Sequence, residues 1–156
     1  MIKIFIGLII LAFSLNGFSQ DYNSEKTSLT NFLKRMYNSS PYTGVKVVED
    51  YENNYLISVV ILDKKKYTSS SLINRVAQVK AQSQASTFLN GSNIEMDFIM
   101  KTTEKRSEES ENVTIETVEK IKENSSGFVK ALELLSNFDS EQEEGMMVFI
   151  YFKTIE

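Results

Sequence analysis

Three lysines stand just before the serines that open the chain's longest helical pattern. Lys64, Lys65 and Lys66 are followed, after two residues, by Ser69 and Ser70. The N–H groups at a helix start attract anions, and nearby ammonium groups add to that attraction. The pattern therefore predicts a binding loop for a phosphate or carboxylate. The alternative is an ordinary solvated loop whose lysines only aid solubility.

Acidic side chains form a second candidate site. They alternate in two segments with strand-like patterns, so they converge only if those strands are neighbours. Paired carboxylates can hydrolyse glycosidic bonds or hold Ca²⁺. Carboxylates that alternate along strands also commonly face solvent, and no calcium-loop motif is present. The residues concerned are Glu49, Asp50, Glu52, Glu95 and Asp97.

The chain contains no histidine and no cysteine. It therefore lacks the commonest general base at neutral pH, any thiolate nucleophile and most zinc sites. Catalysis would need carboxylates, a Ser/Lys pair or tyrosine. We expect no catalytic residue, no metal site and no cofactor. A net charge of −4 and the lack of a basic face argue against nucleic acid as a partner.

Apolar spacing predicts the elements that would position these groups. Residues 24–37 fit a helix, and residues 44–51 and 55–62 fit two strands joined at Asn53 and Asn54. The second strand, YLISVVIL, is almost wholly apolar, which indicates a central strand.

A long helix is expected from Ser69 or Ser70 to Asn90, ended by Gly91 in a left-handed conformation. Small and apolar residues recur along the side expected to pack on a sheet: Ile73, Ala77, Ala81, Ala85 and Phe88. The opposite, polar face is expected to carry Asn74, Gln78, Gln82, Ser83 and Gln84.

The remainder predicts a strand at 92–103 and a mobile acidic loop at 104–112. Residues 113–123 fit either a strand or a helix, and their high Glu and Lys content favours the helix. An alternating strand is expected from about residue 128 to 138, then an acidic turn and a terminal strand from Met146 to Ile155. The order α-β-β-α-β-α-β-β predicts an α+β fold. We expect a single, mainly antiparallel sheet of about five strands with helices mostly on one face.

The first nineteen residues read as a secretory signal peptide. Lys3 precedes an apolar run of about eleven residues, and Gly17 and Ser19 are small residues at positions −3 and −1 of the expected cut before Gln20. That run is shorter than the ~20 residues of a membrane span. We therefore expect a leader at 1–19 and one domain at 20–156, exported to the periplasm or secreted, with no transmembrane segment in the mature chain.

The part from Tyr55 to Lys153 resembles the twenty-kilodalton LPP-type lipoprotein family of bacterial envelopes, whose domain also occurs in a flagellar assembly protein. The resemblance rests on SSSLINRVAQVKAQSQASTFLNG, SSGFVKALELLSNF and GMMVFIYFK. Within these segments it is carried by Ala77, Ala81, Ala85, Gly91, Ser126 and Gly127. It implies an envelope domain that assembles with other proteins and has no enzymatic activity. Because no lipid-anchor cysteine exists here, an unanchored form is expected.

Three functions follow as hypotheses. The leading one is a non-enzymatic exported domain that binds another envelope protein or itself, with the terminal strand as the candidate sheet edge. The second is a small-ligand binder with a pocket between the alanine-lined helix and the sheet, or beside the acidic loop. The third is an enzyme that uses carboxylates or tyrosine.

Overall fold

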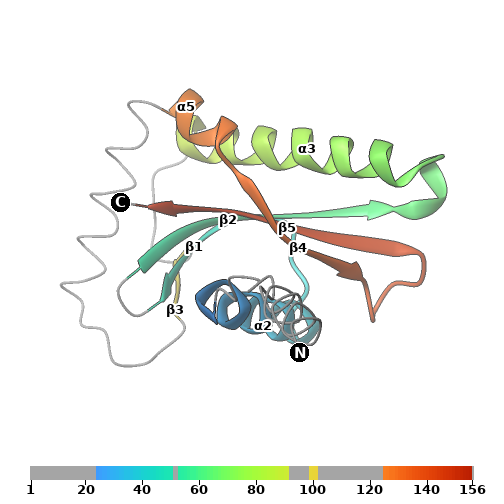
Figure 1. The fold of residues 1–156 in the computed structure, drawn as a ribbon, viewed down its shortest axis with the longest axis horizontal. Helices are drawn as coiled ribbons and strands as arrows, with labels where there is room; N and C mark the ends of the chain where they lie inside the picture. Colours follow the sequence, from blue (N-terminus) through green and yellow to red (C-terminus); the bar gives the residue numbers. More distant parts are fainter. Residues whose placement is uncertain (1–23, 51–52, 92–98, 102–124, 156) are drawn as a thin grey trace, which may run out of the picture.

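The computed structural model describes residues 24–50, 53–91, 99–101 and 125–155, which form one sheet with helices on both sides (Figure 1). In chain order the elements are α2 (Ser24–Ser39), β1 (Gly44–Asp50), β2 (Asn53–Asp63), the 3-10 helix η1 (Lys64–Lys66), α3 (Ser70–Gly91), β3 (Ile99–Lys101), α5 (Ser125–Lys130), β4 (Glu133–Asp139) and β5 (Met146–Ile155).

The sheet has the strand order β3-β1-β2-β5-β4. The strands β1, β2, β5 and β4 pair antiparallel, and the short β3 runs parallel to β1. The α+β class is confirmed. The apolar β2 lies at the centre of the sheet, as its composition predicts, and its long ladder with β5 joins Asn54 to Ile155 at one end and Asp63 to Met146 at the other.

One face of the sheet is covered by α3, with α5 packed beside the C-terminal end of α3 (Figure 1). Ala77, Ala81 and Ala85 are fully buried against apolar residues of β1, β2 and β5. A side chain that ends at Cβ allows a helix backbone to approach a sheet closely, so α3 lies flat along the strands. The helix runs through Gly91, and among the described residues the glycines with positive φ are Gly44 and Gly145. Gly91 therefore does not form the expected left-handed cap.

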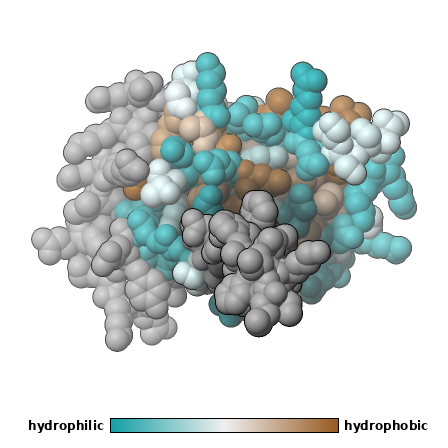
Figure 2. Space-filling model, viewed as in Figure 1, coloured by the Kyte–Doolittle hydropathy of each residue, from teal (hydrophilic) through white to brown (hydrophobic). Residues whose placement is uncertain are grey.

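Among the described helices, α2 covers the opposite face, where it packs Leu29, Leu33 and Tyr37 onto a second apolar core. The expectation of helices mostly on one face therefore needs this refinement: both faces of the sheet are covered. In the same view, hydrophobic residues gather in the middle of the molecule and hydrophilic residues project from the side that carries α3 (Figure 2). Alternate residues of β2 and β5 serve the two cores, which explains why both strands are almost wholly apolar.

The last unit corrects two expectations. Residues 125–130 form the short helix α5, so the strand expected from residue 128 begins only at Glu133. The ladder between β4 and β5 also shifts between Leu134 and Ser136. This bulge places Leu135 and Phe138 together on the α2 core, although simple alternation separates them.

The terminal strand β5 is not the edge strand that we expected. It lies between β2 and β4, so β4 forms the edge on that side of the sheet. Several expectations lie outside the described residues: the leader at 1–19, most of the strand at 92–103, the loop at 104–112 and the helix at 113–123. Within the parts that the structure describes, none of the helices has the length and apolar character needed to cross a membrane.

Candidate functional site

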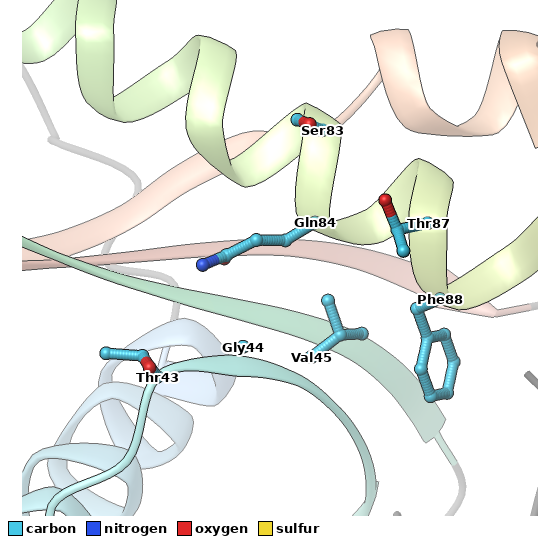
Figure 3. Close-up of a pocket in the computed structure, with 7 residues that line it drawn as sticks. All are labelled: Thr43, Gly44, Val45, Ser83, Gln84, Thr87 and Phe88. Atoms are coloured by element: carbon cyan, nitrogen blue, oxygen red, sulfur yellow. The ribbon is translucent and has the colours of Figure 1, made fainter. Parts of the chain in front are cut away.

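A groove lies between the flank of α3 and the start of β1. Its volume is about 430 Å³, and we call it the Gln84 groove. Gln84 and Phe88 extend from α3 toward the sheet, and Val45 points up from β1 toward them (Figure 3). None of the lining side chains carries a charge; they are Thr43, Gly44, Val45, Ser83, Gln84, Thr87 and Phe88.

The carboxamide of Gln84 is held in place by a buried hydroxyl. Ser58 on β2 is fully buried, and its Oγ donates to Gln84 Oε1 at 2.9 Å, with Ala81 O at 3.2 Å as a second acceptor. A buried hydroxyl needs such partners, because leaving it unpaired costs ~1–3 kcal/mol. Ser58 engages the oxygen of Gln84, and no hydrogen bond from its Nε2 group is made to the described residues.

The groove lies beside the alanine stripe and not beneath it. Ala77, Ala81 and Ala85 are closed off from solvent, so the interface between α3 and the sheet is filled there. The pocket expected between the alanine-lined helix and the sheet therefore corresponds to a hollow on the flank of α3, between this helix and β1. Sequence reasoning placed Gln84 on the outer polar face. Gln84 lies three residues after Ala81 and directly before Ala85, so it stands at the boundary of the buried stripe. This spacing is the sequence signal that could have placed Gln84 beside the sheet.

Only some residues of the predicted anion-binding loop lie together around one hollow. Lys64, Ser69 and Ser70 line a hollow of about 470 Å³, but Lys65 and Lys66 do not. Lys64 Nζ lies 2.8 Å from Asp139 Oδ1, and that carboxylate lines the same hollow. An anion bound in this hollow would have to displace the Asp139 carboxylate or lie beside its negative charge.

The serines beside this loop serve the start of α3. Ser69 Oγ accepts a hydrogen bond from the Leu72 N–H at 3.2 Å, as an N-cap does. Asp63 caps η1 in the same way by accepting from the Lys65 N–H at 3.0 Å. These bonds account for the positions of Asp63 and Ser69 through local structure alone.

The structure describes only two of the five acidic residues in the predicted carboxylate cluster. Glu49 is buried within β1, and Asp50 is half-buried at the end of that strand. Glu52, Glu95 and Asp97 lie outside the described residues. In the described ranges, no three His, Cys, Asp or Glu residues are grouped so that they could hold a metal ion.

Three tyrosines have a raised pKa, which favours the protonated phenol. Burial raises the pKa of Tyr42 to about 12, and burial is also the main cause that raises the pKa of Tyr55 and of Tyr151. A tyrosine that acts as a base or nucleophile needs a lowered pKa. These three phenols therefore fit structural positions better than catalytic ones.

The edge strand β4 borders a further hollow of about 570 Å³ on the α3 side of the sheet, which we call the β4 groove. Leu134 is 43% exposed there, although it is a large apolar residue. The wall opposite β4 is polar and comes from α3. The groove is lined by Ser71, Asn74, Arg75, Gln78, Leu132, Glu133, Leu134, Asn137 and Tyr151.

Comparisons with protein-family models, with curated proteins and with solved structures returned no match to this chain. The resemblance to the envelope lipoprotein family thus stays a prediction.

Proposed function

We propose that this chain is a non-enzymatic exported domain that acts by binding another protein, and that the partner supplies an extended segment to the edge of β4. The observation that carries the proposal is the open outer side of this strand. Among the described residues, β4 pairs with β5 alone. The unpaired N–H and C=O groups of an edge strand can receive a strand from a partner.

The composition of β4 suits such a partner. The middle of the strand, from Leu134 to Phe138, carries no charge. Charges stand only at its ends, where Glu133 pairs with Lys26 at 3.3 Å and Asp139 pairs with Lys64 at 2.8 Å. An added strand would place alternate side chains over the β4 groove, where the exposed Leu134 offers apolar contact.

The same charges disfavour a second copy of this chain as the partner. Two β4 strands paired antiparallel around a twofold axis would bring Glu133 of one copy toward Asp139 of the other. Like charges at opposite positions destabilise a strand pair. The bulge at Leu135 also limits regular pairing to short stretches on either side, so we infer a short segment from a different protein.

The export component of the proposal rests on the leader-like residues 1–19, and the non-enzymatic component rests on the absence of histidine and cysteine. The resemblance to an envelope lipoprotein family supports both.

The test is affinity capture from an envelope extract with three baits: the wild type, Leu134→Lys and Val79→Lys. A lysine on an edge strand blocks strand addition. Val79 is 59% exposed on α3 and lines none of the hollows described above, so Val79→Lys is matched for charge and exposure. We expect the wild type and Val79→Lys to recover the same protein and Leu134→Lys to lose it. Equal recovery by all three baits, or recovery of this chain itself, would contradict the proposal.

A further inference from the structure

We propose that the Gln84 groove is a binding site for a neutral saccharide. This site is separate from β4 and does not depend on the proposed protein partner. It lies on the other flank of α3, between that helix and the start of β1 (Figure 3). Its volume of about 430 Å³ falls within the ~300–1,000 Å³ range of small-molecule sites.

The absence of charge among the lining residues selects the ligand class. A charged ligand that entered this groove would lose hydration without gaining an opposite charge. Three hydroxyl groups, from Thr43, Ser83 and Thr87, can each donate and accept. A saccharide presents the matching set of hydroxyl donors and acceptors on a neutral ring.

The positioning of Gln84 gives the site its directional donor. Ser58 is fully buried and engages Gln84 Oε1, so the carboxamide is oriented before any ligand arrives. The Nε2 group of Gln84 is then left to donate to a ligand. A donor fixed by a second, buried hydrogen bond binds more effectively than a mobile one, because less side-chain freedom is lost.

The apolar part of the wall also fits a sugar ring. Val45 and the Phe88 ring line the groove on the side toward the sheet. Phe88 is only 6% exposed, so the C–H surface of a pyranose would make its apolar contact mainly with the half-buried Val45. The polar hydroxyls of a sugar can then face Thr43, Ser83 and Gln84 while its C–H surface meets the apolar wall.

The matched test compares Gln84→Glu with Gln82→Glu in the purified full chain. The glutamate at position 84 keeps an acceptor for Ser58 but removes the Nε2 donor, and the change at position 82 adds the same charge outside the groove. N-acetylglucosamine and glucose are titrated as neutral probes, with glucuronate as a charged probe. Binding is followed by ¹H–¹⁵N NMR at Gly44, Val45, Thr87 and the Gln84 side-chain amide.

We expect a neutral probe to bind with a dissociation constant on the order of 1 mM and to shift these signals. Gln84→Glu should weaken binding by about tenfold or more, which is the loss of one well-made hydrogen bond, and Gln82→Glu should leave it unchanged. Ser58→Ala should weaken binding several-fold because it releases the carboxamide.

If Ser58→Ala fails to fold, the Gln84 and Gln82 pair still decides the question. No shift with either neutral probe, shifts elsewhere on the molecule, tighter binding of glucuronate, or equal effects of the two glutamate variants would overturn the proposal.

Discussion

The two faces of the sheet are covered in different ways. On one face α3 presents three alanines, all fully buried, and lies along the strands. On the other face α2 reaches the sheet through the larger side chains of Leu29, Leu33 and Tyr37. The comparison shows that the alanine-lined α3 approaches the strands closely, whereas α2 contacts them through longer side chains from further away.

The difference extends to the edge strand. On the α2 side, Phe138 of β4 meets the Tyr37 ring edge-on at 5.7 Å, and Lys34 Nζ lies 5.2 Å from the centre of the Phe138 ring. On the α3 side, Leu134 of the same strand stays exposed beside the β4 groove. Among the described residues, the side of β4 that faces α2 is therefore covered by the chain itself, whereas Leu134 on the other side is exposed.

A large-to-small substitution should destabilise the protein most on the α2 face of the sheet. Leu33 has no exposed surface, so Leu33→Ala leaves a cavity that α2 fills incompletely. We expect the free energy of unfolding to fall by about 2–5 kcal/mol in chemical denaturation. Leu72→Ala, at a position that is 42% exposed on α3, is the control and should cost much less. Similar losses for both variants would show that α2 packs loosely.

A small-to-large substitution should instead destabilise the protein on the α3 face of the sheet. Ala81 is fully buried against the sheet and its carbonyl accepts from Ser58. Ala81→Leu would force α3 away from the strands, and we expect a loss of about 1–3 kcal/mol in the free energy of unfolding. Val79→Leu adds volume on the exposed side of the same helix and should change stability by less than ~0.5 kcal/mol. A neutral Ala81→Leu would contradict the close approach of α3.

The α2 face also contains a buried phenol. The Oη of Tyr42 is buried without a hydrogen-bond partner among the described residues, and burial raises the pKa of Tyr42 to about 12. Between pH 10 and 12 the unfolded chain ionises this phenol while the folded chain keeps it protonated, so the unfolded state binds fewer protons and stability falls as pH rises.

Tyr42→Phe should remove this loss. Near pH 7 its free energy of unfolding should equal that of the wild type or exceed it by up to about 1 kcal/mol, because an unpaired hydroxyl is deleted. Denaturation curves at a series of pH values measure both effects. The same alkaline loss in Tyr42→Phe and in the wild type would assign the effect to other groups.

The smallest expected effect concerns the cation over the Phe138 ring. Lys34→Met keeps the aliphatic stem but removes the charge, and we expect a loss of about 0.5 kcal/mol in thermal unfolding. Lys80→Met on the exposed side of α3 is the matched control, with no expected loss. Identical melting temperatures for the two variants would show that the ammonium group contributes nothing at this edge.

Local patterns predicted most of the fold. The apolar run of β2 indicated a central strand, the alanine spacing indicated the contact face of α3, and the acidic turn correctly joined β4 to β5. Each of these depends on residues close together in the sequence. The interior position of β5 depends on its pairing with the distant β2, which no local pattern specifies.

The sequence prediction was wrong where the spacing of apolar residues fits both a strand and a helix. Phe128, Lys130 and Leu132 alternate as in a strand, yet Phe128 and Val129 lie in α5 and pack with Leu132 on the α3 core. A six-residue segment is too short for its spacing to separate helix from strand. The Gln84 groove could not be predicted either, because the Ser58 hydroxyl that orients Gln84 lies 26 residues away.

The most direct test of the contrast between the two sides of β4 is photo-crosslinking in envelope extract from a photoreactive phenylalanine analogue placed at position 134 or at position 138. We predict that position 134 forms an adduct with a second polypeptide, because Leu134 faces the open groove, and that position 138 forms an adduct within the chain to α2. An intermolecular adduct from position 138, or none from position 134, would contradict the account.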